Sequence, residues 1–182
     1  MERLKQKYFE EVQPSLMKDF GIKNKLATPS LVKIVISIAL GEAKDNEGLL
    51  DKVKVYLKAL SGQTPIITYA KKSIAAFKVS KGQPVGMIVT LRGDKMYAFL
   101  DKLINIVLPK VRDFRGINEA SFDDSGNLNI GITEQIIFPE VDYQTIDKIR
   151  GLGITIVAKS KSRDQKKKLL EYLGMPFRGG KS

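Results

Sequence analysis

Apolar residues alternate with small or polar residues in several stretches of the chain, and this two-residue period predicts β-strands. In residues 31–40, one row consists of Val32, Ile34, Ile36 and Ile38, and the other of Lys33, Val35, Ser37 and Ala39. The second row is small and mildly polar, so we expect no helix to cover that face. Residues 65–70, 84–92 and 153–160 predict further strands, and residues 119–132 predict a hairpin with an Asp-Asp-Ser-Gly-Asn turn.

Four other segments show helical periodicity. The first twenty residues predict an amphipathic helix that ends at Gly21, with apolar residues four apart at Leu4, Tyr8, Val12, Leu16 and Phe20. Residues 47–62 predict a helix whose buried face contains Leu50, Val53, Leu57 and Leu60. We predict a third helix from Asp94 to about Leu108, ended by Pro109, and a last helix over 162–174 with Ser162 as its N-cap.

This mixture of elements predicts an α+β fold. We expect a largely antiparallel sheet with helices packed on one face and an open face available to a partner. The 182 residues contain no repeat, low-complexity linker or compositional break. We therefore expect a single domain over residues 1–182.

The composition excludes several classes of chemistry. The chain has no cysteine and no histidine, which excludes disulfides, thiolate zinc sites and histidine-based catalysis. We expect no cofactor and no metal. No apolar run is long enough to span a bilayer, and the charged N-terminal segment does not resemble a signal peptide. We expect a cytoplasmic protein without a membrane partner.

Charge is separated by sign along the chain. The formal net charge is +11, and residues 52–93 contain eight Lys or Arg and no acid. Residues 159–182 contain eight basic and two acidic residues, whereas residues 113–150 contain eight acids and three basic residues. This separation indicates two surfaces with different partners, one of them a polyanion.

The basic segment around residues 70–83 has two interpretations. Its lysines lie among small residues and Phe77, a composition that suits phosphate neutralisation and stacking on a base or sugar. Alternatively, it is a solvated hairpin with Ile74, Phe77 and Val79 turned inward. We favour RNA, because a stretch of 42 residues without an acid is difficult to explain by solubility alone.

The carboxylates offer an alternative function. A magnesium-assisted nuclease would need Asp123, Asp142 and Asp147 around one cleft, although turn and cap roles explain these residues and Asp124 equally well. A free-standing RNA chaperone is a further alternative, and it would bind many RNAs with little preference.

Several blocks resemble the bacterial type of the large-subunit ribosomal protein five family. They include GEA at 41–43, AKKSIAAFK at 70–78, VRDFRG at 111–116, EQIIFPEVDY at 134–143 and MPF at 175–177, and they extend over nearly the whole chain. The resemblance implies a non-catalytic protein of the large ribosomal subunit. It would bind 5S ribosomal RNA in the central protuberance, near 23S ribosomal RNA and neighbouring 5S-binding proteins.

The resemblance also implies three sets of contact residues. The open sheet face and nearby loops would bind 5S RNA, here through Lys33, Ser37, Gln63, Thr90 and Arg92. The basic loop at 71–82 would contact tRNA in the peptidyl site, here through Lys71, Lys72, Ser73, Phe77, Lys78 and Lys81. The acidic region at 112–143 would bridge to small-subunit ribosomal protein thirteen, here through Arg112, Asp113, Arg115, Glu119, Asp123, Asp124 and Glu140.

Three positions depart from the family pattern. Ser37 replaces an asparagine and so lacks the paired donor and acceptor of an amide. Ala39 and Ala76 replace glycines, which would matter if either backbone needed a positive φ.

Overall fold

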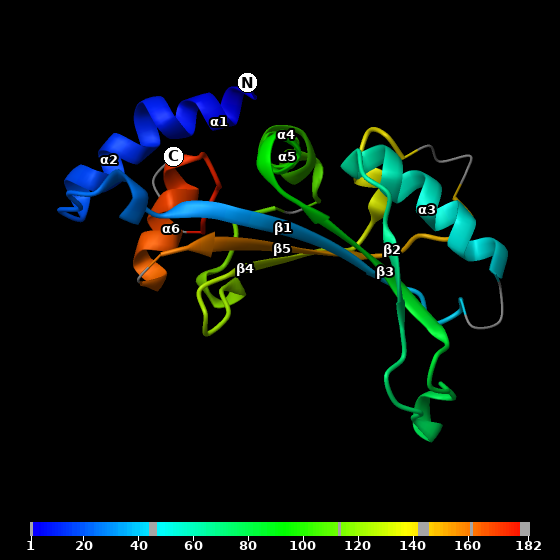
Figure 1. The fold of residues 1–182 in the computed structure, drawn as a ribbon. Helices are drawn as coiled ribbons and strands as arrows, with labels where there is room; N and C mark the ends of the chain where they lie inside the picture. Colours follow the sequence, from blue (N-terminus) through cyan, green and yellow to red (C-terminus); the bar gives the residue numbers. More distant parts are fainter. Residues whose placement is uncertain (1, 44–46, 113, 142–145, 161, 179–182) are drawn as a thin grey trace. The chain divides into compact units, whose positions relative to one another are not determined.

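The computed structural model describes residues 2–43, 47–112, 114–141, 146–160 and 162–178. Five strands form one sheet in the order β2-β3-β1-β5-β4 (Figure 1). The strands are β1 (Ser30–Ala39), β2 (Ile66–Tyr69), β3 (Pro84–Leu91), β4 (Leu128–Ile132) and β5 (Leu152–Lys159). β2 and β3 pair in antiparallel direction, with Ile66 opposite Ile88. The α+β fold with an antiparallel sheet is confirmed.

The contacts within the chain gather in two compact units. Unit 1 comprises Met1–Ile34, Arg92–Ile130 and Thr155–Ser182, and unit 2 comprises Val35–Leu91 and Gly131–Ile154. β1, β4 and β5 each contribute residues to both units. That residues 1–182 form a single domain stays a prediction.

Unit 1 begins with one helical segment of three parts, α1 (Arg3–Lys7), the π-helical η1 (Tyr8–Val12) and α2 (Gln13–Asp19). Leu4, Tyr8, Val12 and Leu16 are all buried, as their four-residue spacing predicts. In a regular α-helix each four-residue step would rotate the side chain by about 40° beyond a full turn. The wider π turn offsets this drift and keeps the four side chains on one face.

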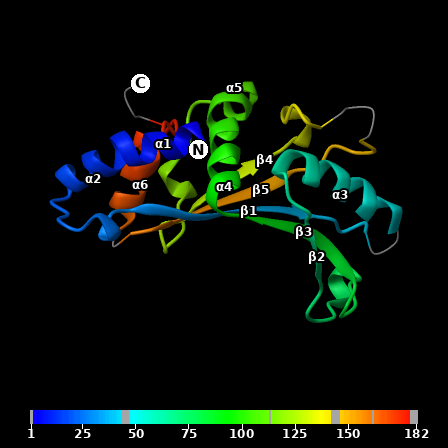
Figure 2. The same ribbon diagram turned by 45° about the horizontal axis from the view of Figure 1, so that its top comes forward.

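Two further helices complete the helical part of unit 1. The second is continuous from α4 (Gly93–Lys102) through η4 (Leu103–Val107) to α5 (Leu108–Lys110). The predicted end at Pro109 is wrong, because the helix includes Pro109 in its last turn. The predicted cap is also wrong: Asp94 lies inside the first turn and binds Lys5 of α1 at 2.6 Å. α6 (Arg163–Tyr172) begins at the predicted cap, where the Ser162 hydroxyl accepts from the Gln165 amide. α1 lies beside α4, and α2 beside α6 (Figure 2).

In unit 2, α3 (Glu47–Ser61) packs on one face of the sheet. Its buried apolar side chains are Leu49, Val53, Tyr56, Leu57 and Leu60, so Leu49 takes the place predicted for Leu50. In this unit β4 buries Ile132. The other buried apolar strand residues are Ile36, Ile38, Met87, Val89, Leu91, Leu152 and Ile154. They come from alternate positions of β1, β3 and β5, so one sheet face is apolar and the opposite face is left partly exposed.

The alternation in β1 is regular only from Ile34 onwards. Val32 was expected in the buried row, but it is 43% exposed, and Leu31 is buried instead. Two successive outward residues, Val32 and Lys33, shift the alternation by one position at the start of the strand. Such a shift is local and leaves no mark in the hydrophobic pattern.

The remaining elements are short. Single turns of 3₁₀-helix occur at η2 (Lys25–Ala27), η3 (Ala75–Phe77), η5 (Glu119–Ser121) and η6 (Gln135–Ile137). The predicted hairpin over 119–132 has its turn at Asp123–Gly126, but its first arm is η5 followed by a single bridge from Phe122 to Leu128. None of the helices in the described ranges has both the length and the hydropathy needed to span a bilayer.

Candidate nucleic-acid interface

The uncovered face of unit 2 carries polar side chains beside apolar ones. Thr90 of β3 shares it with Ile88 and with the paired Ile66 of β2, which is 70% exposed. Ser37 is exposed on β1, and its hydroxyl donates to the Gly153 carbonyl of β5 at 3.3 Å. A Cβ on Gly153 would lie 2.8 Å from the Ser37 Oγ, and one on Gly86 would overlap the Ile38 carbonyl oxygen. Gly153 thus leaves room for the Ser37 hydroxyl, and Gly86, itself buried, allows the close approach of the β1 backbone.

Gln63 lies beside this face at the end of α3. Its Nε2 donates to the Thr90 carbonyl of β3 at 3.1 Å, so the fold brings these two predicted residues together. Gly62 ends α3 with a φ of +65°, a conformation that glycine adopts without strain. Lys33 and Arg92 belong to unit 1, so their place beside Ser37, Gln63 and Thr90 stays a prediction.

The loop between β2 and β3 is an ordered extension of that hairpin. Two backbone hydrogen bonds close its base: the Ala70 amide donates to the Gln83 carbonyl and the Gly82 amide to the Ala70 carbonyl, both at 2.9 Å. A β-bridge between Ile74 and Val79 closes its tip. The Ser73 hydroxyl accepts from the Lys81 amide at 2.9 Å. The predicted contact residue Ser73 therefore has a structural role inside the loop.

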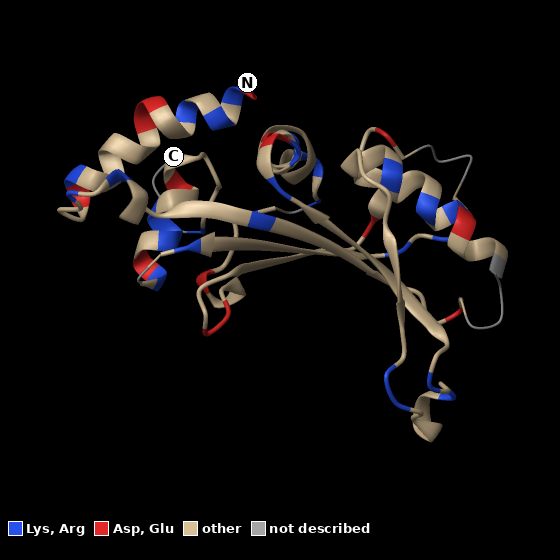
Figure 3. Ribbon diagram, in the orientation of Figure 1, with Lys and Arg blue, Asp and Glu red and all other residues tan. Residues whose placement is uncertain are grey.

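The tip of this loop displays apolar and cationic side chains together. Phe77 is 72% exposed and Ile74 is 48% exposed, so the interpretation of an inward-turned hairpin is wrong for both. Lys71, Lys72, Lys78 and Lys81 are all exposed. The segments that carry Lys or Arg lie on the two arms of the loop, on either side of a tip without charge (Figure 3). Lys71, Lys72 and Lys81 form no ion pair within the described residues. The loop offers uncompensated charge beside an exposed ring.

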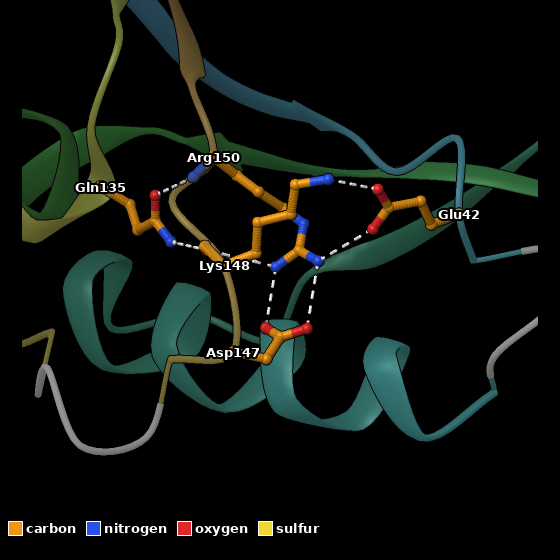
Figure 4. A network of polar contacts seen from close by, with 5 residues as sticks. All are labelled: Glu42, Gln135, Asp147, Lys148 and Arg150. Carbon is orange, nitrogen blue, oxygen red and sulfur yellow. Dashed lines mark hydrogen bonds and ion pairs between the residues drawn. The ribbon is translucent and has the colours of Figure 1, made fainter.

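A polar network of unit 2 fixes the segment that leads into β5 (Figure 4). Gln135 is fully buried, donating to the Lys148 carbonyl at 2.7 Å and accepting from the Arg150 amide. The Arg150 side chain, 9% exposed, binds Asp147 and Glu42. Lys148 binds the same Glu42 carboxylate at 2.5 Å.

The charged groups of this network change one another's pKa values. Hydrogen bonding from Lys148 lowers the pKa of Glu42, and hydrogen bonding from Arg150 lowers the pKa of Asp147. Burial raises the pKa of the neighbouring Tyr56 phenol to about 12. Our sequence reasoning missed Gln135 and Arg150 as structural residues, although Gln135 lies in the block at 134–143 that carried the family resemblance.

Most of the acidic residues predicted to form a bridge lie in unit 1. Glu119 pairs with Lys167, which lowers the pKa of Glu119. Asp123 accepts from the Asn127 amide at 2.7 Å and its side chain at 2.9 Å, whereas Asp124 is exposed. Arg112 and Arg115 are exposed in unit 1, Glu140 is exposed in unit 2, and Asp113 lies outside the described residues.

The carboxylates do not assemble into a metal site in the described part of the chain. No three Asp or Glu residues there lie close enough to hold an ion. Asp123 belongs to unit 1 and Asp147 to unit 2, each with its own local partner, and Asp142 lies outside the described residues.

The two alanines at glycine positions are compatible with the backbone. Lys78 is the only described residue other than glycine with a positive φ, at 49°. Ala39 and Ala76 therefore adopt ordinary conformations, and the missing glycines cause no backbone strain.

Comparison with known proteins now identifies the family. The family model for ribosomal protein L5 matches residues 24–79, and the companion model for the C-terminus of this ribosomal family matches residues 84–177. The chain belongs to the ribosomal protein L5 family. It is 52% identical to large ribosomal subunit protein uL5 of Carboxydothermus hydrogenoformans and 54% identical to that of Thermoanaerobacter sp. strain X514. Each alignment covers 97% of this chain and 99% of the relative.

Membership of the L5 family confirms the predicted resemblance and the predicted role in the large ribosomal subunit. The protein is a structural constituent of the large ribosomal subunit and binds RNA. The family is not one of enzymes, so the nuclease interpretation is excluded and no residue is assigned a catalytic role.

Proposed function

We propose that the protein binds 5S ribosomal RNA through the open face of unit 2, contacts the tRNA in the peptidyl site through the loop at 70–83, and joins the small subunit through its acidic residues. The observation that supports this most directly is the ordered hairpin loop. It combines exposed lysines, an exposed Phe77 and a backbone fixed by its own hydrogen bonds. A preorganised loop loses little conformational entropy when it binds.

The open face suits a folded RNA. Ser37 and Thr90 present hydroxyls that can bind a sugar–phosphate backbone, and the exposed Ile66 of β2 can pack on a ribose or base. Lys33 and Arg92 would neutralise the phosphates. We propose Lys33, Ser37, Gln63, Thr90 and Arg92 as the 5S contacts, with 23S RNA and other 5S-binding proteins as further neighbours.

The loop suits a second RNA that is bound more transiently. We propose that Lys71, Lys72, Lys78 and Lys81 bind phosphates of the tRNA and that Phe77 packs on a sugar or base. Ser73 supports the loop from within, because its hydroxyl holds the Lys81 amide.

The acidic region suits a basic protein rather than an RNA. We propose that Arg112, Asp113, Arg115, Glu119, Asp123, Asp124 and Glu140 face small-subunit ribosomal protein thirteen. Its positive charge would complement the net −5 of residues 113–150, which contain eight acids and three basic residues.

A competition assay tests the RNA assignments. Thr90→Val keeps the side-chain shape and removes the hydroxyl, so we expect weaker binding of labelled 5S RNA but unchanged salt dependence. The triple variant Lys71→Gln, Lys72→Gln, Lys81→Gln should weaken tRNA binding and lower the slope of log K against log salt by about 2 to 3. Lys54→Gln, at an exposed position on α3, serves as the control. Equal competition by 5S RNA, tRNA and an unrelated hairpin would instead favour the chaperone.

A further inference from the structure

Leu26 of unit 1 is held out into solvent by a rigid turn. It is 88% exposed, more than any other large hydrophobic residue in the described part of the chain. Asn24 caps η2 through its side chain, which accepts from the Leu26 amide at 2.9 Å, and Gln13 donates to the Lys25 carbonyl at 3.2 Å. On the C-terminal side, the buried Tyr8 hydroxyl donates to the Pro29 carbonyl at 2.8 Å. The exposure of Leu26 therefore belongs to a fixed conformation.

Pockets adjoin this turn on two sides. One of about 400 Å³ is lined by residues 20–24, Ala27 and Gln165. The other, of about 360 Å³, is lined by Asn24, Leu26, Ala27, Thr28, Lys159 and Ser160. Both lie within unit 1. Leu26 lines the second pocket, and an exposed apolar side chain at a hollow resembles part of an interface rather than an isolated surface residue.

The charged residues of this turn and of its two pockets are all lysines. Lys23, Lys25 and Lys159 are exposed, and none of them forms an ion pair within the described residues. The residues that line the two pockets include no Asp or Glu. By contrast, Lys5, Lys148, Lys167 and Lys168 all pair with carboxylates. The cations around Leu26 therefore suit an external anion, and a polyanion would neutralise all three at once.

We propose that Leu26, Lys23, Lys25 and Lys159 form a further ribosomal RNA contact, separate from the open face of unit 2 and from the loop at 70–83. The lysines bind successive phosphates, and Leu26 packs on a ribose or an unstacked base beside the pocket that it lines. This inference rests on the proposed function in one respect: both take ribosomal RNA as the partner.

A photo-crosslinker at the tip of the turn tests the class of partner. Large subunits are assembled with the full-length variant Leu26→p-benzoylphenylalanine and irradiated. We expect crosslinks to ribosomal RNA, mapped by reverse-transcription stops. Crosslinks confined to a protein, or none at all, overturn the proposal. The same photoreactive residue in place of Val55 on α3, itself 69% exposed, controls for chance proximity.

A binding series tests the energetics, with 5S RNA and 23S RNA as separate probes. Leu26→Ala should weaken binding to the crosslinked RNA by about tenfold, the effect of burying one apolar side chain. The triple variant Lys23→Gln, Lys25→Gln, Lys159→Gln should lower the salt slope by about 2 to 3, whereas Val55→Ala and Lys110→Gln change neither quantity. Unchanged affinity for both probes in both test variants overturns the proposal.

The two hypotheses fail in distinguishable ways. If Thr90→Val and the loop variants reduce RNA binding but the Leu26 and lysine variants do not, only the contact at Leu26 is wrong. If the Leu26 and lysine variants alone reduce binding, the open-face assignment fails and this contact stands. Thermal unfolding of each variant tests for misfolding. We expect unchanged midpoints for the Leu26 and lysine variants, because the side chains of Lys23, Lys25, Leu26 and Lys159 are exposed in the free protein.

Discussion

Asp147 and Arg150 bind each other through two parallel hydrogen bonds, Nη1 to Oδ1 at 2.8 Å and Nη2 to Oδ2 at 3.1 Å. The same guanidinium reaches Glu42 with Nη2 at 3.3 Å (Figure 4). A planar guanidinium is the one side chain that can satisfy this geometry with both of its terminal nitrogens. Arg150 thus ties the segment before β5 to the residues that follow β1.

Replacing Arg150 with lysine should therefore destabilise the protein although the charge is kept. Arg150→Lys loses the two-point contact and leaves a mostly buried ammonium with fewer partners, so we expect a loss of about 1–2 kcal/mol. Urea unfolding followed by circular dichroism measures it. Arg115→Lys, at an exposed position, should change the stability by less than about 0.5 kcal/mol. Equal effects in the two variants would show that the paired geometry is unimportant.

The same network should make stability sensitive to acid. Hydrogen bonding from Arg150 lowers the pKa of Asp147, and that from Lys148 lowers the pKa of Glu42. Their contribution is therefore complete above the ordinary carboxyl pKa of about 4 and is lost as the pH falls through the lowered values. Asp147→Asn should lose less stability than the parent protein between pH 6 and pH 3, as measured by urea midpoints. Asp124→Asn, at an exposed position, should keep the parental pH profile, and a parental profile in Asp147→Asn would contradict the linkage.

Gly86 should tolerate no side chain. A Cβ there would overlap the Ile38 carbonyl oxygen and lie 3.3 Å from the Thr68 Oγ1, and the first contact involves backbone that cannot rotate away. We expect Gly86→Ala to cost about 1–3 kcal/mol, the range for overpacking. Gly131→Ala is the matched control, because its Cβ meets nothing within 4 Å and its φ is not positive. Comparable thermal midpoints for the two variants would disprove the steric argument.

The proposed bridge is best tested at Asp124. Reversal of Glu119 or Asp123 would also break the pair with Lys167 or the turn hydrogen bonds to Asn127, so a loss of function could reflect misfolding. Asp124 is exposed, and we expect Asp124→Lys to weaken subunit association in sucrose-gradient profiles while 5S RNA binding stays unchanged. Asp51→Lys on α3 controls for net charge. Normal association in Asp124→Lys would exclude this residue from the bridge.

Local patterns in the sequence predicted most of the elements. The two-residue period of β3 and β5 matched the burial of Met87, Val89, Ile154 and Ile156. The helix starting after Ser162 was also found. The shift in burial pattern at Leu31 and Val32 was not predicted, because a one-residue irregularity in a strand does not alter its composition.

The sequence by itself determined the fold class, the family and the separation of charge along the chain, because hydrophobic period, motif blocks and sign of charge are local properties. Only the tertiary structure decided which charges are compensated. Arg150 meets Glu42 across 108 positions, while Lys159 lines a pocket with Leu26, and that pocket has no carboxylate among its lining residues. Such pairings depend on the path of the chain, and no local pattern records which distant residue a side chain will reach.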